Sequence, residues 1–187
     1  LTGLDVVSAS HYDGAAATAE AALMACRATG RDRILVSRAV HPQYRETLRT
    51  YAAGAGILVE DVPIVRSGPA AGTTDRAALQ RALAADRPPA GLVAAQPNFF
   101  GLLEPMADLG AATHAAGGLF VAVVEPVSLA VLAPPGAYGA DIAAGEGQPL
   151  GIPLAYGGPY LGLLACTEAL VRQIPGRLVG QTTDLDG

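Results

Sequence analysis

The chain of 187 residues contains no lysine, and all 12 of its basic residues are arginines. Lysine is normally among the commonest residues, so its absence removes whole kinds of site. A Walker-type phosphate loop and a kinase-type ATP site both need a lysine, and both are excluded. A Schiff base with pyridoxal phosphate or a carbonyl substrate is excluded too, because its nucleophile is the lysine amine. A GC-rich genome favours arginine over lysine, which explains the use of arginine at surface positions. Such a bias would not by itself remove a lysine that is needed for catalysis.

Cysteine, positive charge and long apolar runs are also scarce. Cys26 and Cys166 are far apart and predict no disulfide framework, so we expect buried thiols in a reducing cytosol. A net charge of −5 argues against nucleic-acid binding. No apolar run reaches the length of a membrane span and no signal-peptide pattern occurs, so we expect a cytoplasmic globular protein. Leu1 is not a methionine and residues 184–187 are turn-like, so we expect a piece of a longer polypeptide.

Several common site signatures are missing as well. The glycine pairs at 54–56 and 145–147 lack the third glycine of a dinucleotide-binding fingerprint. His11, His41 and His114 are scattered, and no zinc-type spacing of His or Cys occurs, which argues against a metal site. No serine has the flanking glycines of a hydrolase nucleophile elbow.

Short apolar runs alternate with helical patterns along most of the chain. The alternation predicts parallel strands joined by right-handed crossovers, and hence one doubly wound, mostly parallel α/β domain over residues 1–187. A helix that starts after Thr74 is expected to be capped by that residue. We expect strands over residues 4–7, 34–37, 57–59, 92–95, 119–124 and 161–166, and helices over 15–28, 42–53, 74–85, 103–116 and 168–173.

Ligands of such sheets bind outside the carboxyl ends of the strands, so residues that follow strands are the candidates for a site. His41 could stack on a planar ligand, or it could simply orient its loop. Asn98 follows a proline at a strand end, where asparagine is also an ordinary turn former. Glu125 ends the most hydrophobic strand. An acid there holds the pyridine nitrogen in pyridoxal phosphate enzymes, but a carboxylate can equally cap a helix or face solvent.

The segment 139–162 is the most distinctive part of the chain. Its dense glycines and prolines specify a path through tight turns, which usually lies beside a ligand or another subunit. Its apolar residues, including Leu150 and Leu154, lead us to expect burial rather than a mobile loop.

Together with other motifs, this segment resembles the glycine cleavage system P protein, a glycine dehydrogenase (decarboxylating). The resemblance extends in order over nearly the whole chain and is closest to subunit 1 of the two-subunit form. It implies the large-domain core of an aminotransferase-like, type I fold, from the middle of a longer chain. The motifs are YDGA at 12–15, AVHPQYRETL at 39–48, PNFFG at 97–101, PPGAYGADI at 134–142 and PGRLVG at 175–180.

The resemblance also implies a cofactor and partners. The family decarboxylates glycine on pyridoxal phosphate and passes the aminomethyl group to the lipoyl arm of the H protein. The cofactor lysine belongs to subunit 2 of an expected heterotetramer, and Gln148 stands at the lysine position of this chain. Glu125 replaces the more usual aspartate before proline. No cofactor contact is therefore certain, and His41, Asn98, Glu125 and Gln148 are vestigial candidates.

Three hypotheses remain open at this point. The first is a non-catalytic subunit that supports assembly and completes the site of its lysine-bearing partner. The second is the amino-terminal half of a single-chain P protein, whose lysine would lie later in the same polypeptide. The third is a stand-alone α/β module that binds a small anion at the strand ends, where Gly-rich turns and helix amino-termini could supply backbone donors.

Overall fold

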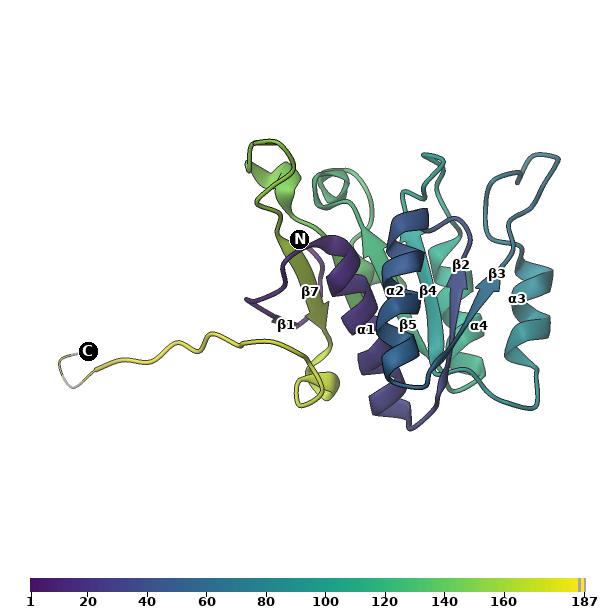
Figure 1. Cartoon of the computed structure of the whole chain (residues 1–187), viewed down its shortest axis with the longest axis horizontal. Helices are drawn as coiled ribbons and strands as arrows, with labels where there is room; N and C mark the ends of the chain where they lie inside the picture. The colour runs from purple at the N-terminus through teal and green to yellow at the C-terminus, as the bar shows by residue number, and fades with distance from the viewer. Residues whose placement is uncertain (185, 187) are drawn as a thin grey trace.

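The strands form one mixed sheet that matches the predicted α/β class. A computed structural model describes residues 1–184 and 186. The strands are β1 (Val6–Val7), β2 (Arg33–Ser37), β3 (Leu58–Val62), β4 (Gly91–Gln96), β5 (Leu119–Val124), β6 (Ile142–Glu146) and β7 (Gly162–Cys166). Within the described residues they pair in the order β1-β7-β6-β5-β4-β2-β3 (Figure 1). Neighbours from β6 to β3 are parallel, whereas β7 is antiparallel to both β6 and β1. The predicted doubly wound, mostly parallel sheet is confirmed.

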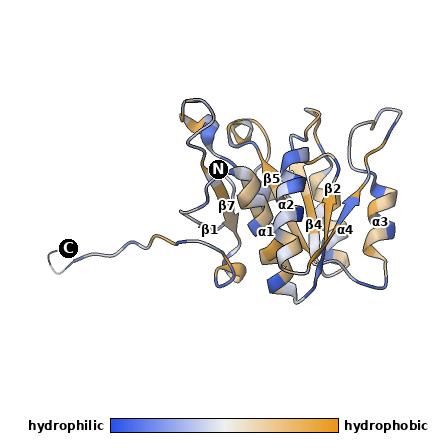
Figure 2. Ribbon diagram, in the orientation of Figure 1, coloured by the Kyte–Doolittle hydropathy of each residue, from blue (hydrophilic) through white to orange (hydrophobic). Residues whose placement is uncertain are grey.

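Helices cover both faces of this sheet. They are α1 (Gly14–Thr29), α2 (Pro42–Gly54), α3 (Arg76–Leu83) and α4 (Met106–Ala115). Ile34 and Val36 point into the core beneath α1 and α2, whereas Leu35 points into the core beneath α3 and α4. This alternation is what the two-residue period of a strand requires when both faces are covered. The inner strands are accordingly apolar, whereas the edge strand β3 carries hydrophilic residues (Figure 2).

The helix boundaries follow from local capping. Asp13 accepts a hydrogen bond from the Ala16 amide at 2.8 Å and starts α1, which ends at Gly30 in a left-handed conformation with φ of 66°. The predicted cap Thr74 is wrong by one residue, because Asp75 accepts from the Ala78 amide and starts α3. The hydroxyl of Thr74 is instead buried against that of Ser37, 2.7 Å away.

Two other helix predictions need correction. The helix expected over 103–116 begins only at Met106, because Pro105 sets its first turn and the amide of Glu104 is drawn to the Gln96 side chain at 2.9 Å. The helix expected over 168–173 is only a 3-10 turn, η4 (Glu168–Leu170). Three further 3-10 turns, η1 (Pro126–Ala130), η2 (Pro135–Tyr138) and η3 (Gln148–Leu150), follow prolines or contain one.

Strand β6 lies inside the segment that we expected to be a glycine-rich turn path. Its residues Ile142–Glu146 are mostly small, because α1 packs closely against them and β5 lies alongside. A side chain at Gly145 would overlap the carbonyl oxygen of Val124 on β5. Close packing thus favours small residues in β6. The bulky β-branched residues by which a strand is usually predicted from sequence are therefore few in it.

A segment near the start of the chain lies beside a segment near its end. The Ala9 amide donates to the Arg177 carbonyl at 2.8 Å, and the Arg177 amide donates to Ser10 Oγ at 2.7 Å. Residues 178–184 then run extended, away from the sheet (Figure 1). The turn expected over 184–187 includes residues outside the described ones. None of the described helices is both long and apolar enough to cross a membrane.

Candidate functional site

A cleft of about 220 Å³ opens at the carboxyl ends of β4, β5 and β6. This is where the topology of a doubly wound sheet places ligands. Its walls come from segments that are far apart in the sequence. The lining residues are His41, Tyr44, Ala95, Pro97, Asn98, Phe99, Val123, Val124, Glu125, Glu146 and Pro149. Three of the four candidate residues therefore line one cleft, and the fourth, Gln148, stands next to Pro149.

His41 forms part of one wall of the cleft. Its Nδ1 atom accepts a hydrogen bond from the Gln43 amide at 3.2 Å, so the imidazole caps α2. Its ring meets the Phe99 ring edge-on, with the ring centroids 4.8 Å apart, and lies 5.5 Å from the Tyr44 ring. The ring is thus fixed by a backbone bond and by two aromatic neighbours, and it presents an aromatic surface to the cleft.

Asn98 is 5% exposed, and its side chain is fully engaged by the protein. The amide nitrogen donates to the Gly72 carbonyl at 3.0 Å and to Oε1 of the buried Glu104 at 2.9 Å. Its carbonyl oxygen accepts from the Phe100 and Leu102 amides at 3.0 and 3.1 Å. These bonds use the side chain's two donors and two acceptor sites, so Asn98 shapes the loop after β4 and has no free polar group for a ligand.

Glu125 turns its carboxylate toward its own backbone. One oxygen accepts from the Val127 amide at 3.1 Å and the other from the Ser128 amide at 2.6 Å. The carboxylate therefore caps η1, in an exposed position at the rim of the cleft. This arrangement corresponds to the capping alternative that the sequence left open.

Gln148 lies at the start of η3, two residues after the cleft residue Glu146. Its amide donates to Glu146 Oε1 at 2.9 Å. Its side-chain nitrogen Nε2 is buried and has no hydrogen-bond partner among the described residues.

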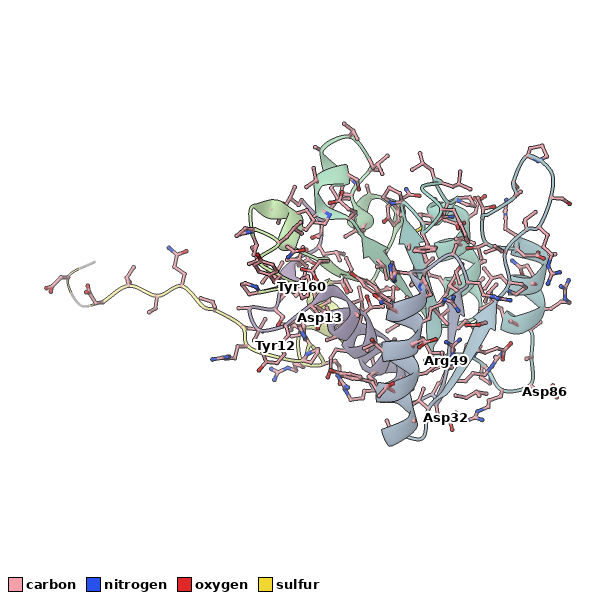
Figure 3. All side chains as sticks on the ribbon, turned by 45° about the horizontal axis from the view of Figure 1, so that its top comes forward. Tyr12, Asp13, Asp32, Arg49, Asp86 and Tyr160 are labelled. Carbon is pink, nitrogen blue, oxygen red and sulfur yellow. The ribbon has the colours of Figure 1, made fainter. Side chains whose placement is uncertain are left out.

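Glu146 is a central residue of the cleft that the sequence did not single out. Its Oε2 accepts from the Gly14 amide at 2.8 Å, and its Oε1 accepts from the amides of Gln148 and Leu161, both at 2.9 Å. One carboxylate thereby joins the start of α1, the end of β6 and the chain entering β7. Figure 3 shows Tyr12, Asp13 and Tyr160 where these segments meet. The only signal in the sequence was an acid between two glycines at 145–147.

Burial raises the pKa of Tyr44 to about 12, and the charges of Glu146 and Asp13 add to this effect. The hydroxyl of Tyr44 lies so close to Gly14 that a side chain there would overlap it. Tyr44 therefore remains a neutral phenol and cannot supply an anion to the cleft near neutral pH.

The glycine-rich segment is more exposed than expected. Leu150 is 50% exposed and Leu154 is 77% exposed, so the expectation of burial is wrong for these residues. Val131 and Tyr156 are exposed as well.

The described residues contain no group of three or more His, Cys, Asp or Glu side chains that could hold a metal ion. Cys26 and Cys166 are both free and buried, as expected. Burial raises the pKa of the Cys26 thiol to about 11, with a further contribution from Asp32.

The mixed seven-stranded sheet with its cleft is an aminotransferase-like fold of the type found in pyridoxal phosphate enzymes. An alanine–glyoxylate aminotransferase from Nostoc superposes over 90% of the chain with a TM-score of 0.64, at 20% identity. A glycine decarboxylase (P-protein) of the glycine cleavage system, in inhibitor-bound form, superposes over the whole chain with a TM-score of 0.82, at 45% identity.

The family model described as glycine cleavage system P-protein matches residues 1–187, and the chain belongs to this family. The "Probable glycine dehydrogenase (decarboxylating) subunit 1" of Moorella thermoacetica is 57% identical over all 187 residues. The protein of the same name from Desulfitobacterium hafniense is 50% identical. The chain spans 40% of the length of both relatives and of the P-protein structure.

Proposed function

We propose that this chain is the central part of the large domain of a non-catalytic subunit of glycine dehydrogenase (decarboxylating). The observation that carries the proposal is a cleft at the strand ends of a P-protein-family chain whose 187 residues contain no lysine. The complex would decarboxylate glycine on pyridoxal phosphate and transfer the aminomethyl group to the lipoyl arm of the H protein. The subunit with the cofactor lysine would be its partner, subunit 2. The unpaired, buried cysteines support a cytoplasmic location.

The polar groups of the cleft do not fit a covalently held pyridoxal phosphate. Glutamine at 148 has no nucleophilic nitrogen, Asn98 is saturated by protein groups, and Glu125 caps a turn. The residues of this chain would therefore perform no covalent step. Its residues instead hold the backbone around the cleft, with Glu146 as the main anchor.

The exposed apolar residues of the glycine-rich segment support a role in assembly. Leu154 and Tyr156 project from the glycine-rich segment beside the cleft, where a packed partner surface would cover them. The relatives named subunit 1 favour the two-subunit form over the single-chain alternative. Relatives at up to 57% identity over the whole chain also favour it over a stand-alone anion-binding module.

Locating the cofactor tests the proposal. The full-length parent chain and its partner subunit are loaded with pyridoxal phosphate, treated with borohydride and digested for mass spectrometry. We expect the reduced cofactor on a lysine peptide of the partner alone. A stoichiometric adduct on the parent chain would contradict the non-catalytic assignment, and it would favour the single-chain form.

A further inference from the structure

The starts of two helices meet the cleft, and a helix start is where proteins commonly bind phosphate groups. The first amides of a helix lack partners within the helix, and the helix dipole gives them a partial positive charge. Tyr44 of α2 lines the cleft, and the Gly14 amide of α1 reaches Glu146, which lines it too. The availability of these amides therefore decides whether this chain can hold the phosphate of a cofactor without a covalent bond.

The amides at the start of α1 are engaged by the chain's own carboxylates. The Gly14 amide donates to Oε2 of Glu146 at 2.8 Å, and the Ala16 amide donates to Oδ1 of Asp13 at 2.8 Å. Gly14 is buried, and a β-carbon added to it would lie 2.7 Å from the Glu146 amide nitrogen. The start of α1 is thus packed against the end of β6, and the Glu146 carboxylate stands where an anion would bind.

The start of α2 and the turn η1 are engaged in the same way. Pro42 is the first residue of α2 and has no amide proton, and the Gln43 amide donates to Nδ1 of His41 at 3.2 Å. Two backbone amides of η1 donate to the Glu125 carboxylate at 3.1 and 2.6 Å. The chain's own acceptors thus take the donors that a phosphate group would need at each of these places.

The charges around the cleft also oppose a phosphate group. Within the part of the chain that the structure describes, the cleft lining holds two carboxylates, Glu125 and Glu146, and no arginine. The chain supplies no lysine either. A phosphate group beside Glu146 would meet a like charge with no cation in the lining to offset it, and such repulsion is strong where solvent is partly excluded.

We propose that the Glu146 carboxylate is a built-in anion that closes the cleft to phosphate-bearing ligands, so that this chain excludes pyridoxal phosphate even without a covalent bond. The inference rests on the proposed function, in which the partner subunit holds the cofactor. Glu146 is the decisive residue, because its carboxylate accepts three backbone amides, one of them from Gly14 at the start of α1. Loss of this carboxylate would free those amides and remove one negative charge from the cleft.

The test is a calorimetric titration of the full-length parent chain with pyridoxamine phosphate. This probe carries the ring and the phosphate of the cofactor but no aldehyde, so it cannot form a Schiff base with any lysine of the parent chain. Glu146→Ala should bind one equivalent, at least about tenfold more tightly than the wild type, which is expected to show no saturable binding. Inorganic phosphate should compete for the same site.

Two further variants separate the carboxylate from its surroundings. Glu146→Gln still fills the position and should bind pyridoxamine phosphate much more weakly than Glu146→Ala does. Glu125→Ala is the matched control, since it removes the same charge from the cleft but leaves the start of α1 engaged, and it should behave as the wild type does.

A second measurement covers the destabilisation expected of Glu146→Ala. The melting temperature of each protein is recorded with sodium formate and with sodium chloride at equal ionic strength. Formate carries the carboxylate that the substitution removes, so it should raise the melting temperature of Glu146→Ala more than chloride does. The wild type should not distinguish the two salts.

Saturable binding of pyridoxamine phosphate to the wild type, displaced by inorganic phosphate, would overturn the inference. So would a Glu146→Ala chain that gains neither binding of pyridoxamine phosphate nor stabilisation by formate. Both results would leave the proposed function intact, because that proposal is refuted by a different result, the borohydride-reduced adduct of pyridoxal phosphate on a lysine of the parent chain.

Discussion

Removing the carboxylate of Glu146 should loosen the walls of the cleft more than removing any other acid near it. Its two oxygens accept three backbone amides, from Gly14, Gln148 and Leu161, at 2.8 to 2.9 Å. A hydrogen bond to a charged acceptor contributes about 1.5–3 kcal/mol when buried, and Glu146 is only partly buried. Glu146→Ala should therefore lower the free energy of unfolding by about 3–5 kcal/mol.

Glu146→Gln removes the negative charge of the side chain but keeps its size and shape. Its amide oxygen can still accept from Gln148 and Leu161, but its amide nitrogen would face the Gly14 amide, donor against donor. The expected loss is about 1–2 kcal/mol, between those of the wild type and the alanine variant. Glu125→Ala is the matched control, since Glu125 also accepts two amides but caps only an exposed turn. That substitution should cost about 0.5–1 kcal/mol.

The assay is urea unfolding of the full-length parent chain, together with limited proteolysis. In Glu146→Ala, the segment 147–161 should become the first site of cleavage, because two of the three amides that the carboxylate holds belong to it. A Glu146→Ala protein as stable and as protease-resistant as Glu125→Ala would refute the anchoring role.

Three further predictions follow from burial and close contact. The raised pKa of Tyr44 makes the folded chain lose stability as pH rises from the tyrosine's unfolded pKa of about 10 toward 12, and Tyr44→Phe should remove its share of this loss in unfolding experiments, leaving the shares of Cys26 and Tyr138, whose pKa values burial also raises. Cys26 and Cys166 should resist alkylation in the native chain and react fully in urea, because both thiols are buried and have raised pKa values; rapid native labelling would contradict this. Gly14→Ala should lower the melting temperature because its side chain would overlap the Tyr44 hydroxyl, whereas Gly54→Ala, in open space at the end of α2, should leave it unchanged or raise it.

The architecture was largely accessible from the sequence, because strand and helix periods differ and the inner strands are apolar. The rule that parallel strands end at one edge also anticipated that His41, Asn98 and Glu125 would lie along one cleft. Strand β6 was not predicted, because residues 142–146 are mostly small rather than β-branched. The reason is their close packing against α1, which only the tertiary structure shows.

The role of each cleft residue was less accessible. Asn98 looks available in the sequence, yet the nearby Glu104 and three backbone groups use its whole hydrogen-bonding capacity. Glu146 gains its importance from Gly14 and Leu161, which are distant in the sequence. The pairing of β6 with β7 brings Leu161 to it, and the bridge between His11 and Gly162 brings the start of α1. Such contacts depend on the closed tertiary structure, which a local pattern does not contain.

The central claim is that this chain is necessary for catalysis without performing its covalent step. The most direct measurement is glycine-dependent carbon dioxide exchange with H protein and pyridoxal phosphate, using the full-length parent alone, the lysine-bearing partner alone, and the two together. The account predicts exchange only in the mixture, rising with added parent chain until the two subunits are equimolar. Full exchange by the partner alone, or by the parent alone, would contradict it.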